Sequence, residues 1–118
     1  MVAVDAATVL NGCLEIAPGR FGPLGAAAGG EEGLQSVRLT ANGCLVEEDE
    51  ARLAFKTVEC AAGDVLLFTG YVPHRSASNR SSSSRRALFF TYNPLSQGDH
   101  HDAYYAAKHS GTSCKRIN

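Results

Sequence analysis

The sequence predicts a mainly β domain of the sandwich or jelly-roll type, with one C-terminal helix. Short apolar segments recur between turn-forming Gly, Pro and Asn residues, which is typical of such folds. Only residues 98–109 (GDHHDAYYAAKH) combine a candidate N-cap, Asp99, with a run of helix formers. With 118 residues, 44% of them hydrophobic and 19% charged, the chain has enough material for one globular domain and not for two.

The N-terminal part of the chain predicts two strands and then a long loop region. Residues 2–4 and 13–17 are short apolar segments, separated by the turn-forming pair Asn11-Gly12. Between residues 21 and 53 the composition changes, first to Gly, Ala and Glu, which pack a core poorly, so we expect a variable surface region there. Within that region, residues 47–53 predict one helical turn.

The strongest strand signals come later in the chain. Residues 65–68 (VLLF) and 87–90 (ALFF) are continuous apolar runs, as expected of strands buried on both faces. The segment between them, residues 70–86, carries a proline and a run of serines. We interpret it as strand, turn and strand, which predicts a hairpin.

This hairpin would place chemically useful side chains on one wall. If its turn is centred near Ser81-Ser82, His74 and Ser76 share a face with Arg85, because strand side chains alternate. Arg86 then points to the other face, although a one-residue change in turn length would exchange the two arginines. An imidazole can ligate a metal, a guanidinium can grip a carboxylate with two hydrogen bonds, and a serine hydroxyl can add a third contact.

Composition and charge exclude several classes of protein. The chain has 11 Lys and Arg against 12 Asp and Glu, so we expect no nucleic-acid partner and no anionic membrane surface. No apolar stretch is long enough to span a membrane and no secretory signal is present, so the expected location is cytoplasmic. Four cysteines stand far apart without zinc-site spacing, and we expect reduced thiols.

The motifs of the second half resemble a known family. The spacing His-x-Ser, then Asn, then Arg eleven residues after the His is formed by His74, Ser76, Asn79 and Arg85. Together with three segments, this spacing resembles the C-terminal half of the phytanoyl-CoA dioxygenase family. The segments are NGCLEIAPGR (11–20), AAGDVLLFTGYVPHRSASNRS (61–81) and SRRALFFTYNP (84–94). The C-terminal tail is similar to bacterial-type members, some of which hydroxylate aminoalkyl-phosphonates.

The resemblance implies a double-stranded β-helix that binds Fe(II) and 2-oxoglutarate and hydroxylates a small-molecule substrate, with ascorbate as a candidate reductant. It implies His74 as the distal iron ligand, with Arg85 and Ser76 holding the 2-oxoglutarate carboxylate. The implied organisation is one partial dioxygenase domain over residues 1–118. Its parts are core strands in 1–20 and 54–94, a variable loop region in 21–53 and a C-terminal helix in 98–109.

The family's His-x-Asp pair, which supplies the other two iron ligands, is missing upstream of residue 11. The string His100-His101-Asp102 follows the distal histidine and lies in the expected helix, where residues two apart point in different directions, so we reject it as that pair. We therefore expect this chain alone to have little or no activity. Two alternatives stay open: a non-catalytic β-sandwich module that binds carboxylates, and an inactive gene fragment. The sequence does not predict an oligomeric state.

Overall fold

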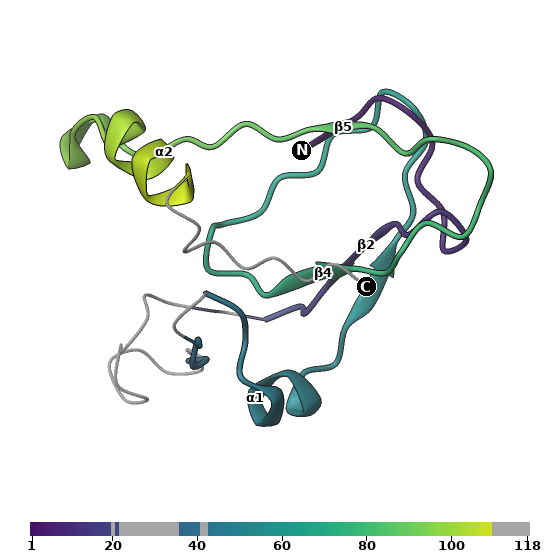
Figure 1. Ribbon diagram of the computed structural model, residues 1–118, viewed down its shortest axis with the longest axis horizontal. Coiled ribbons are helices and arrows are strands. Elements are labelled where there is room, and N and C mark those ends of the chain that lie inside the picture. Colours follow the sequence, from purple (N-terminus) through teal and green to yellow (C-terminus); the bar gives the residue numbers. More distant parts are fainter. Residues whose placement is uncertain (20, 22–35, 41–42, 110–118) are drawn as a thin grey trace.

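The computed structural model describes residues 1–19, 21, 36–40 and 43–109 (Figure 1). These residues form two small antiparallel sheets, two α-helices and one 3-10 helix. The strands are β1 (Val2–Ala3), β2 (Leu14–Ile16), β3 (Lys56–Val58), β4 (His74–Ser76) and β5 (Ala87–Leu88). The helices are α1 (Glu47–Arg52), η1 (Leu95–Gln97) and α2 (His101–His109). The mainly β class is confirmed, and the incomplete double-stranded β-helix, or jelly-roll, stays a prediction.

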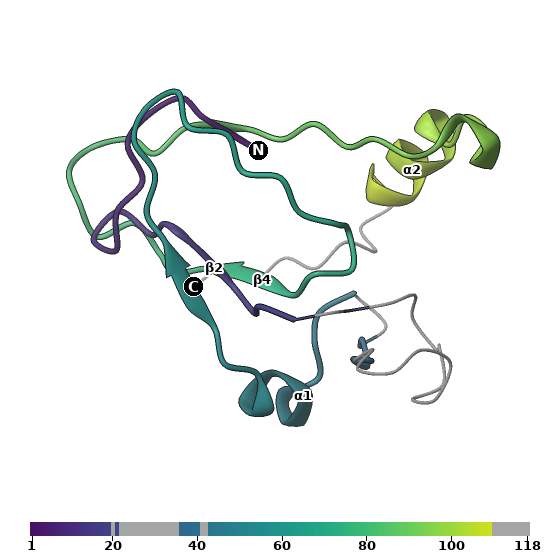
Figure 2. The ribbon, with the colours of Figure 1, turned by 180° about the vertical axis from the view of Figure 1, so that it is seen from behind.

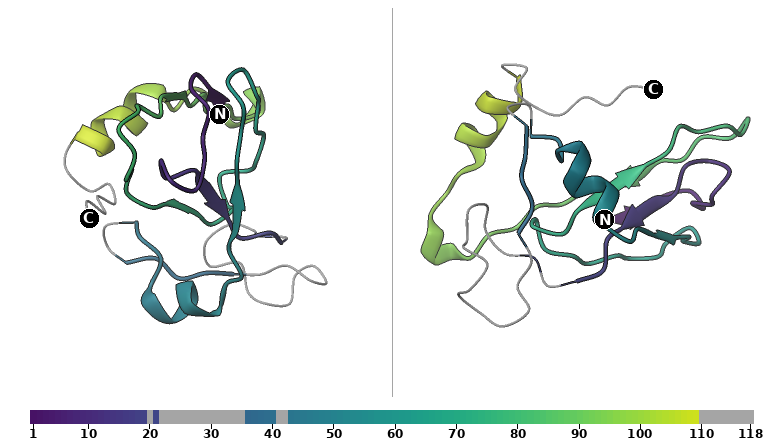
Figure 3. Two further views of the ribbon diagram at one scale, coloured as in Figure 1. Left: turned by 90° about the vertical axis from the view of Figure 1, so that its right-hand side faces the viewer. Right: turned by 90° about the horizontal axis from the view of Figure 1, so that it is seen from below.

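The two sheets lie in separate layers. In one, β2 is central and pairs with both β3 and β4; in the other, β1 pairs with β5. Figures 1 and 2 show these layers one above the other, with α1 below the β2 sheet and α2 beyond the end of the β5 segment. Figure 3 shows the same separation from the side and from below.

The expected strand at residues 65–68 is reduced to bridging contacts with the N-terminus. Val2 bridges to Val65. The N-terminal ammonium of Met1 donates to the carbonyl of Leu66 at 2.8 Å, and the N–H of Leu66 donates to the carbonyl of Met1 at 2.9 Å. The expectation that this run and residues 87–90 are buried on both faces is wrong. Leu67 is 86% exposed and Phe89 is 58% exposed. Nothing in the described part of the chain covers the second face of either run.

The core is correspondingly small and lies around the N-terminal strands. Its buried apolar residues are Met1, Ala3, Ala7, Cys13, Leu14, Ala17 and Phe21. Asn11 is buried among them, and its side chain accepts a hydrogen bond from the N–H of Thr8 and donates one to the carbonyl of Ala6. These bonds satisfy the polar groups that the turn before β2 buries.

Both helices form close to where the sequence predicts them. The helix α1 carries four acidic residues in its first turn, where the positive end of the helix dipole favours them, and Arg52 in its last turn. A bidentate contact from Arg38 holds Asp49 of this helix and lowers the pKa of its carboxyl to about 2. At α2, the N–H of His101 donates to the side chain of Asp99 at 2.9 Å.

Two further findings bear on the expectations from composition. Cys13 and Cys60 are free thiols, whereas Cys44 takes part in a disulfide, so the expectation of reduced cysteines throughout is wrong for Cys44. Cys114 lies outside the described residues. Within the described segments, no helix is long and apolar enough to cross a membrane.

Candidate metal and carboxylate site

The strand β4 presents its side chains to two different surroundings. Its pairing with β2 sets Ile16 opposite His74 and Leu14 opposite Ser76. Because strand side chains alternate, His74 and Ser76 share one face and Arg75 takes the other. The register therefore brings two of the three predicted site residues to the same side of one strand.

The imidazole of His74 is oriented by its neighbours. Its Nδ1 lies 2.9 Å from the carbonyl oxygen of Val72, and its ring meets the edge of Phe68 with centroids 5.1 Å apart. A carbonyl oxygen only accepts, so Nδ1 carries the proton and donates. This leaves the lone pair of Nε2 for a ligand, which is the arrangement that metal-binding histidines use.

The predicted hairpin is wrong. The strand β4 pairs with β2, whereas β5 pairs with β1, so the segments carrying His74 and Arg85 belong to different layers. The turn between them is organised locally by Asn79, whose Oδ1 accepts from the N–H and hydroxyl of Ser81 and whose Nδ2 donates to the carbonyl of Ser83. These hydrogen bonds join residues of the turn to one another, and β4 and β5 form no ladder with each other.

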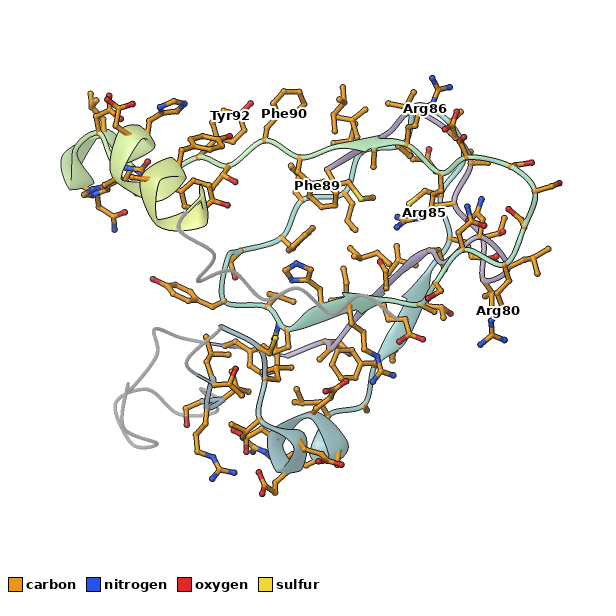
Figure 4. All side chains as sticks on the ribbon, viewed as in Figure 1. Arg80, Arg85, Arg86, Phe89, Phe90 and Tyr92 are labelled. Carbon is orange, nitrogen blue, oxygen red and sulfur yellow. The ribbon has the colours of Figure 1, made fainter. Side chains whose placement is uncertain are left out.

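Arg85 and Arg86 differ in what they contact. Arg86 donates to both carboxylate oxygens of Asp5, at 2.8 and 2.9 Å, and these bonds lower the pKa of that carboxyl to about 2. Arg85 is half-buried and makes no hydrogen bond or ion pair within the described segments. In Figure 4, Arg85 and Phe89 project toward the layer that contains β4, whereas Arg86 projects away from it. The unpaired guanidinium is thus the one directed between the layers.

Arg85 also lies near the start of β2. Burial raises the pKa of the Cys13 thiol, and the positive charge of Arg85 is among the effects that oppose this rise. Cys13 directly precedes Leu14, which is the partner of Ser76 in the ladder. The charge of Arg85 therefore acts on a residue next to β2, the strand that pairs with His74 and Ser76 of β4.

The opposite face of β4 holds a contact network that the sequence did not reveal. The guanidinium of Arg75 donates to Glu15 at 2.5 Å and to Glu50 at 3.0 Å, and it lies 4.1 Å from the ring centroid of Phe55. Both carboxylates raise the pKa of Arg75. The network connects β4 to β2 and α1. The opposite charges of Glu15 and Arg75 are visible in the sequence, but they indicate an ion pair only once β2 is known to pair with β4.

A cavity of about 490 Å³ adjoins the start of β4. Two stretches of chain line it, one before and after α1 and one leading into β4. The lining residues are Val37, Leu39, Gly43, Cys44, Leu45, Glu50, Phe55, Gly70, Tyr71, Val72, Pro73, His74 and Arg75. The predicted metal-binding histidine therefore forms part of a cavity wall.

His74 is the one predicted metal ligand, and the described residues contain no group of three or more His, Cys, Asp or Glu side chains that could hold a metal ion. The rejected string on α2 has its His101 Nδ1 3.0 Å from the carboxylate of Asp102, on the helix and exposed. For the predicted site, the described residues supply the imidazole of His74, with its Nε2 lone pair available, and the half-buried guanidinium of Arg85, on facing layers.

Comparison with known proteins gives consistent matches. The family model for phytanoyl-CoA dioxygenase matches residues 1–87. The chain is 39% identical over 107 residues to methylphosphonate hydroxylase of Gimesia maris, covering 91% of the chain and 37% of that protein. It is 38% identical to 2-aminoethylphosphonate dioxygenase of an uncultured bacterium, HF130_AEPn_1, covering 92% of the chain and 37% of that protein.

A third relative is dioxygenase lolE1 of Epichloe uncinata, which is 34% identical over 90% of the chain and 37% of that protein. The chain thus spans a little over a third of the length of these relatives. No solved structure matches it.

Proposed function

The chain belongs to the phytanoyl-CoA dioxygenase family, and from this premise we propose that it supplies part of the active site of an Fe(II)- and 2-oxoglutarate-dependent dioxygenase. His74 would bind the iron through Nε2, because Nδ1 is committed to the carbonyl of Val72. Arg85 would bind the far carboxylate of 2-oxoglutarate with two parallel hydrogen bonds, and Ser76 would donate a further one. When bound, iron with 2-oxoglutarate supplies the activation of oxygen needed to hydroxylate a C–H bond.

The observation that carries this proposal is the contrast between two adjacent arginines. Arg86 is satisfied by Asp5, whereas Arg85 is half-buried and unpaired among the described residues. A guanidinium with no partner among the described residues keeps its donors available, and an anionic ligand can accept from them. A dicarboxylate whose other end reaches a metal on His74 fits both features.

One histidine does not hold iron against water, so a working site needs two further ligands beyond those in the described segments. The family resemblance implies a His-x-Asp pair for this role. We therefore propose that the full activity belongs to a longer polypeptide. Its substrate would be a small organic molecule, and phosphonates are candidates because two relatives are named for them.

The proposal is tested by titrating this chain with 2-oxoglutarate and measuring binding by calorimetry. Arg85→Met should weaken binding by about 10- to 100-fold, the value of about 1.5–3 kcal/mol for a hydrogen-bonded charged pair. Arg86→Met is the matched control and should leave the affinity unchanged. If Arg86→Met weakened binding and Arg85→Met did not, the 2-oxoglutarate carboxylate would be bound by Arg86, and the proposal would be refuted.

The metal half of the proposal needs its own measurement. Added Mn(II), a redox-stable substitute for iron, should tighten 2-oxoglutarate binding to the unsubstituted chain and have no such effect on His74→Ala. Succinate formation from 2-oxoglutarate with Fe(II) and ascorbate should be low for this chain. It should rise in a version extended at its N-terminus to supply the missing ligands. Robust turnover by the chain alone, abolished by His74→Ala, would refute the claim that ligands are missing.

A non-catalytic carboxylate-binding module is the second candidate. It is favoured by the absence of a three-ligand group among the described residues, combined with the unpaired Arg85. This candidate predicts that 2-oxoglutarate binding depends on Arg85 and is identical with and without Mn(II). The same titrations therefore separate the two functions.

A further inference from the structure

The side of the β1 sheet that faces away from the β2 sheet is apolar. Val2 lies opposite Leu88 of β5 and bridges to Val65 on its other side. Residues directly opposite each other share a face of a sheet, so three chain segments contribute to one surface. Because strand side chains alternate, every second residue along each segment adds to it. This surface, called the outer face, consists of Val2, Val4, Val65, Leu67, Leu88, Phe90 and Tyr92.

Most of the outer face is uncovered. Leu67 and Tyr92 are 86% and 85% exposed, and the others, apart from the two N-terminal valines, are more than half exposed. Figure 4 shows Phe90 and Tyr92 projecting away from the layer that contains β4. The inward neighbours are better covered, since Ala3 is buried and Leu66 is half-buried. Soluble monomers seldom leave a contiguous apolar patch of several hundred Å² uncovered, so we expect the outer face to be an interface.

The charged group beside the outer face is already neutralised. Arg86 lies two residues before Leu88 and projects to the same side, and it donates to both carboxylate oxygens of Asp5. The formal net charge of the chain is -1. Two copies of the chain therefore approach each other with little electrostatic repulsion, whereas a strongly charged partner would find no unpaired cation here to attract it.

The area of the outer face is close to what a dimer needs. Specific interfaces bury at least about 1,000 Å² in total, counted over both partners. An aromatic side chain buries about 150–250 Å². The outer face combines its two aromatic side chains with the aliphatic side chains of three segments. In a two-fold dimer both copies use the same face, so its area counts twice.

We propose that the outer face is the interface of a homodimer, in which the β1 sheets of two copies pack face to face about a two-fold axis. Sheets stacked in this way lie about 10 Å apart, as in β-sandwiches, and their side chains interdigitate. The inference does not depend on the proposed function. The dimer covers the side of β5 that faces away from Arg85.

The inference is tested by sedimentation velocity of the 118-residue chain over a series of concentrations. We expect one reversible equilibrium between monomer and dimer. Leu67→Lys should raise the dissociation constant about 100-fold or more, because a two-fold interface loses two buried leucines at once. Leu95→Lys is the matched control, since Leu95 lies on η1 outside the outer face and is 95% exposed. It introduces the same charge and should leave the dissociation constant unchanged.

A second variant tests the outer face from another segment. Tyr92→Lys should also favour the monomer, and the far-UV circular dichroism of both variants should match that of the unsubstituted chain. A chain that sediments as a monomer at every concentration would refute the inference. Larger species that persist in Leu67→Lys, or an equal loss of dimer in Leu95→Lys, would refute it as well.

The competing occupant of the outer face is part of a longer polypeptide, and the version extended at its N-terminus distinguishes the two. If the extended version is a monomer that Leu67→Lys destabilises more than Leu95→Lys does, the extension covers the outer face and the second copy is refuted. A dimer of the extended version that Leu67→Lys dissociates would support the inference. The 2-oxoglutarate titrations of Arg85→Met are unaffected by either result.

Discussion

Gly12 allows the turn before β2 to pack against the end of β4, and its replacement by Ala tests this close approach. The φ angle of Gly12 is +78°, and a Cβ at this position would collide with the backbone carbonyl of Ala77, one residue beyond Ser76. The collision is with backbone rather than with a flexible side chain, so β4 itself must shift. Gly12→Ala therefore bears on both stability and the position of the predicted site.

The cost of Gly12→Ala in free energy of unfolding is compared with that of Gly63→Ala, because both glycines have a positive φ. Gly63 has a φ of +91°, and nothing lies within 4 Å of a Cβ built on it. Gly63→Ala should cost about 1–2 kcal/mol, the penalty for an L residue in the left-handed region. Gly12→Ala should cost about 2–5 kcal/mol, because overpacking adds about 1–3 kcal/mol to that penalty. The effect of Ala on the unfolded chain is common to both variants and cancels in the comparison.

The assay is urea-induced unfolding of both variants, with the free energy compared at a common denaturant concentration. A second readout is the environment of His74, followed by its imidazole NMR signals, which should change in Gly12→Ala and not in Gly63→Ala. Equal destabilisation by the two substitutions would refute the reasoning, because it would show that contact with Ala77 adds nothing.

Three further predictions concern the ion pairs and thiols. Arg75→Met removes two partly exposed ion pairs and one cation–π contact, and should destabilise the chain by about 1–3 kcal/mol in urea unfolding. Arg86→Met should destabilise it less, and the reverse order would contradict the role of the Arg75 network in holding β4. Hydrogen bonds from Arg86 lower the pKa of Asp5 from 3.8 to about 2 in the folded state. The contribution of Asp5 to stability is therefore complete above pH 4 and is lost as the pH falls toward 2. Asp5→Asn should flatten the dependence of the melting temperature on pH between these values. Because Cys13 is buried with a raised pKa and Cys60 is half-buried, Ellman's reagent should modify Cys60 first, and faster labelling of Cys13 would show that the core opens readily.

The sequence predicted the elements better than it predicted their partners. Residues 13–17 and the helices near 47–53 and 98–109 were recognisable because their signals are local, such as the apolar run at 13–17 and the N-cap followed by helix formers at 98–109. The pairing of β2 with β4 joins residues 60 positions apart, and no periodicity within either segment encodes it. The predicted hairpin failed for this reason, since a serine-rich turn between two strands was taken to mean that the strands pair.

The candidate site shows the same division. His74, Ser76 and Arg85 were singled out from a hairpin register that proved wrong and from the family resemblance, and their roles stay predictions. The orientation of His74 by the carbonyl of Val72 and the pairing of Arg86 with Asp5 depend on segments that meet only in the folded chain. Burial of the runs at 65–68 and 87–90 was mispredicted because hydrophobicity reports what a residue favours, not whether a second layer is present to cover it.

The separation of β4 and β5 into different layers changes what would determine the length of the ligand in the proposed function. In a hairpin, the distance between its ends would follow from the number of residues in the turn, and each insertion would exchange Arg85 for its neighbour. Here each end is anchored to its own sheet, β4 by β2 and β5 by β1. Under the proposed function, the separation of the two sheets, rather than the number of residues in the connecting turn, would set the length of dicarboxylate that fits.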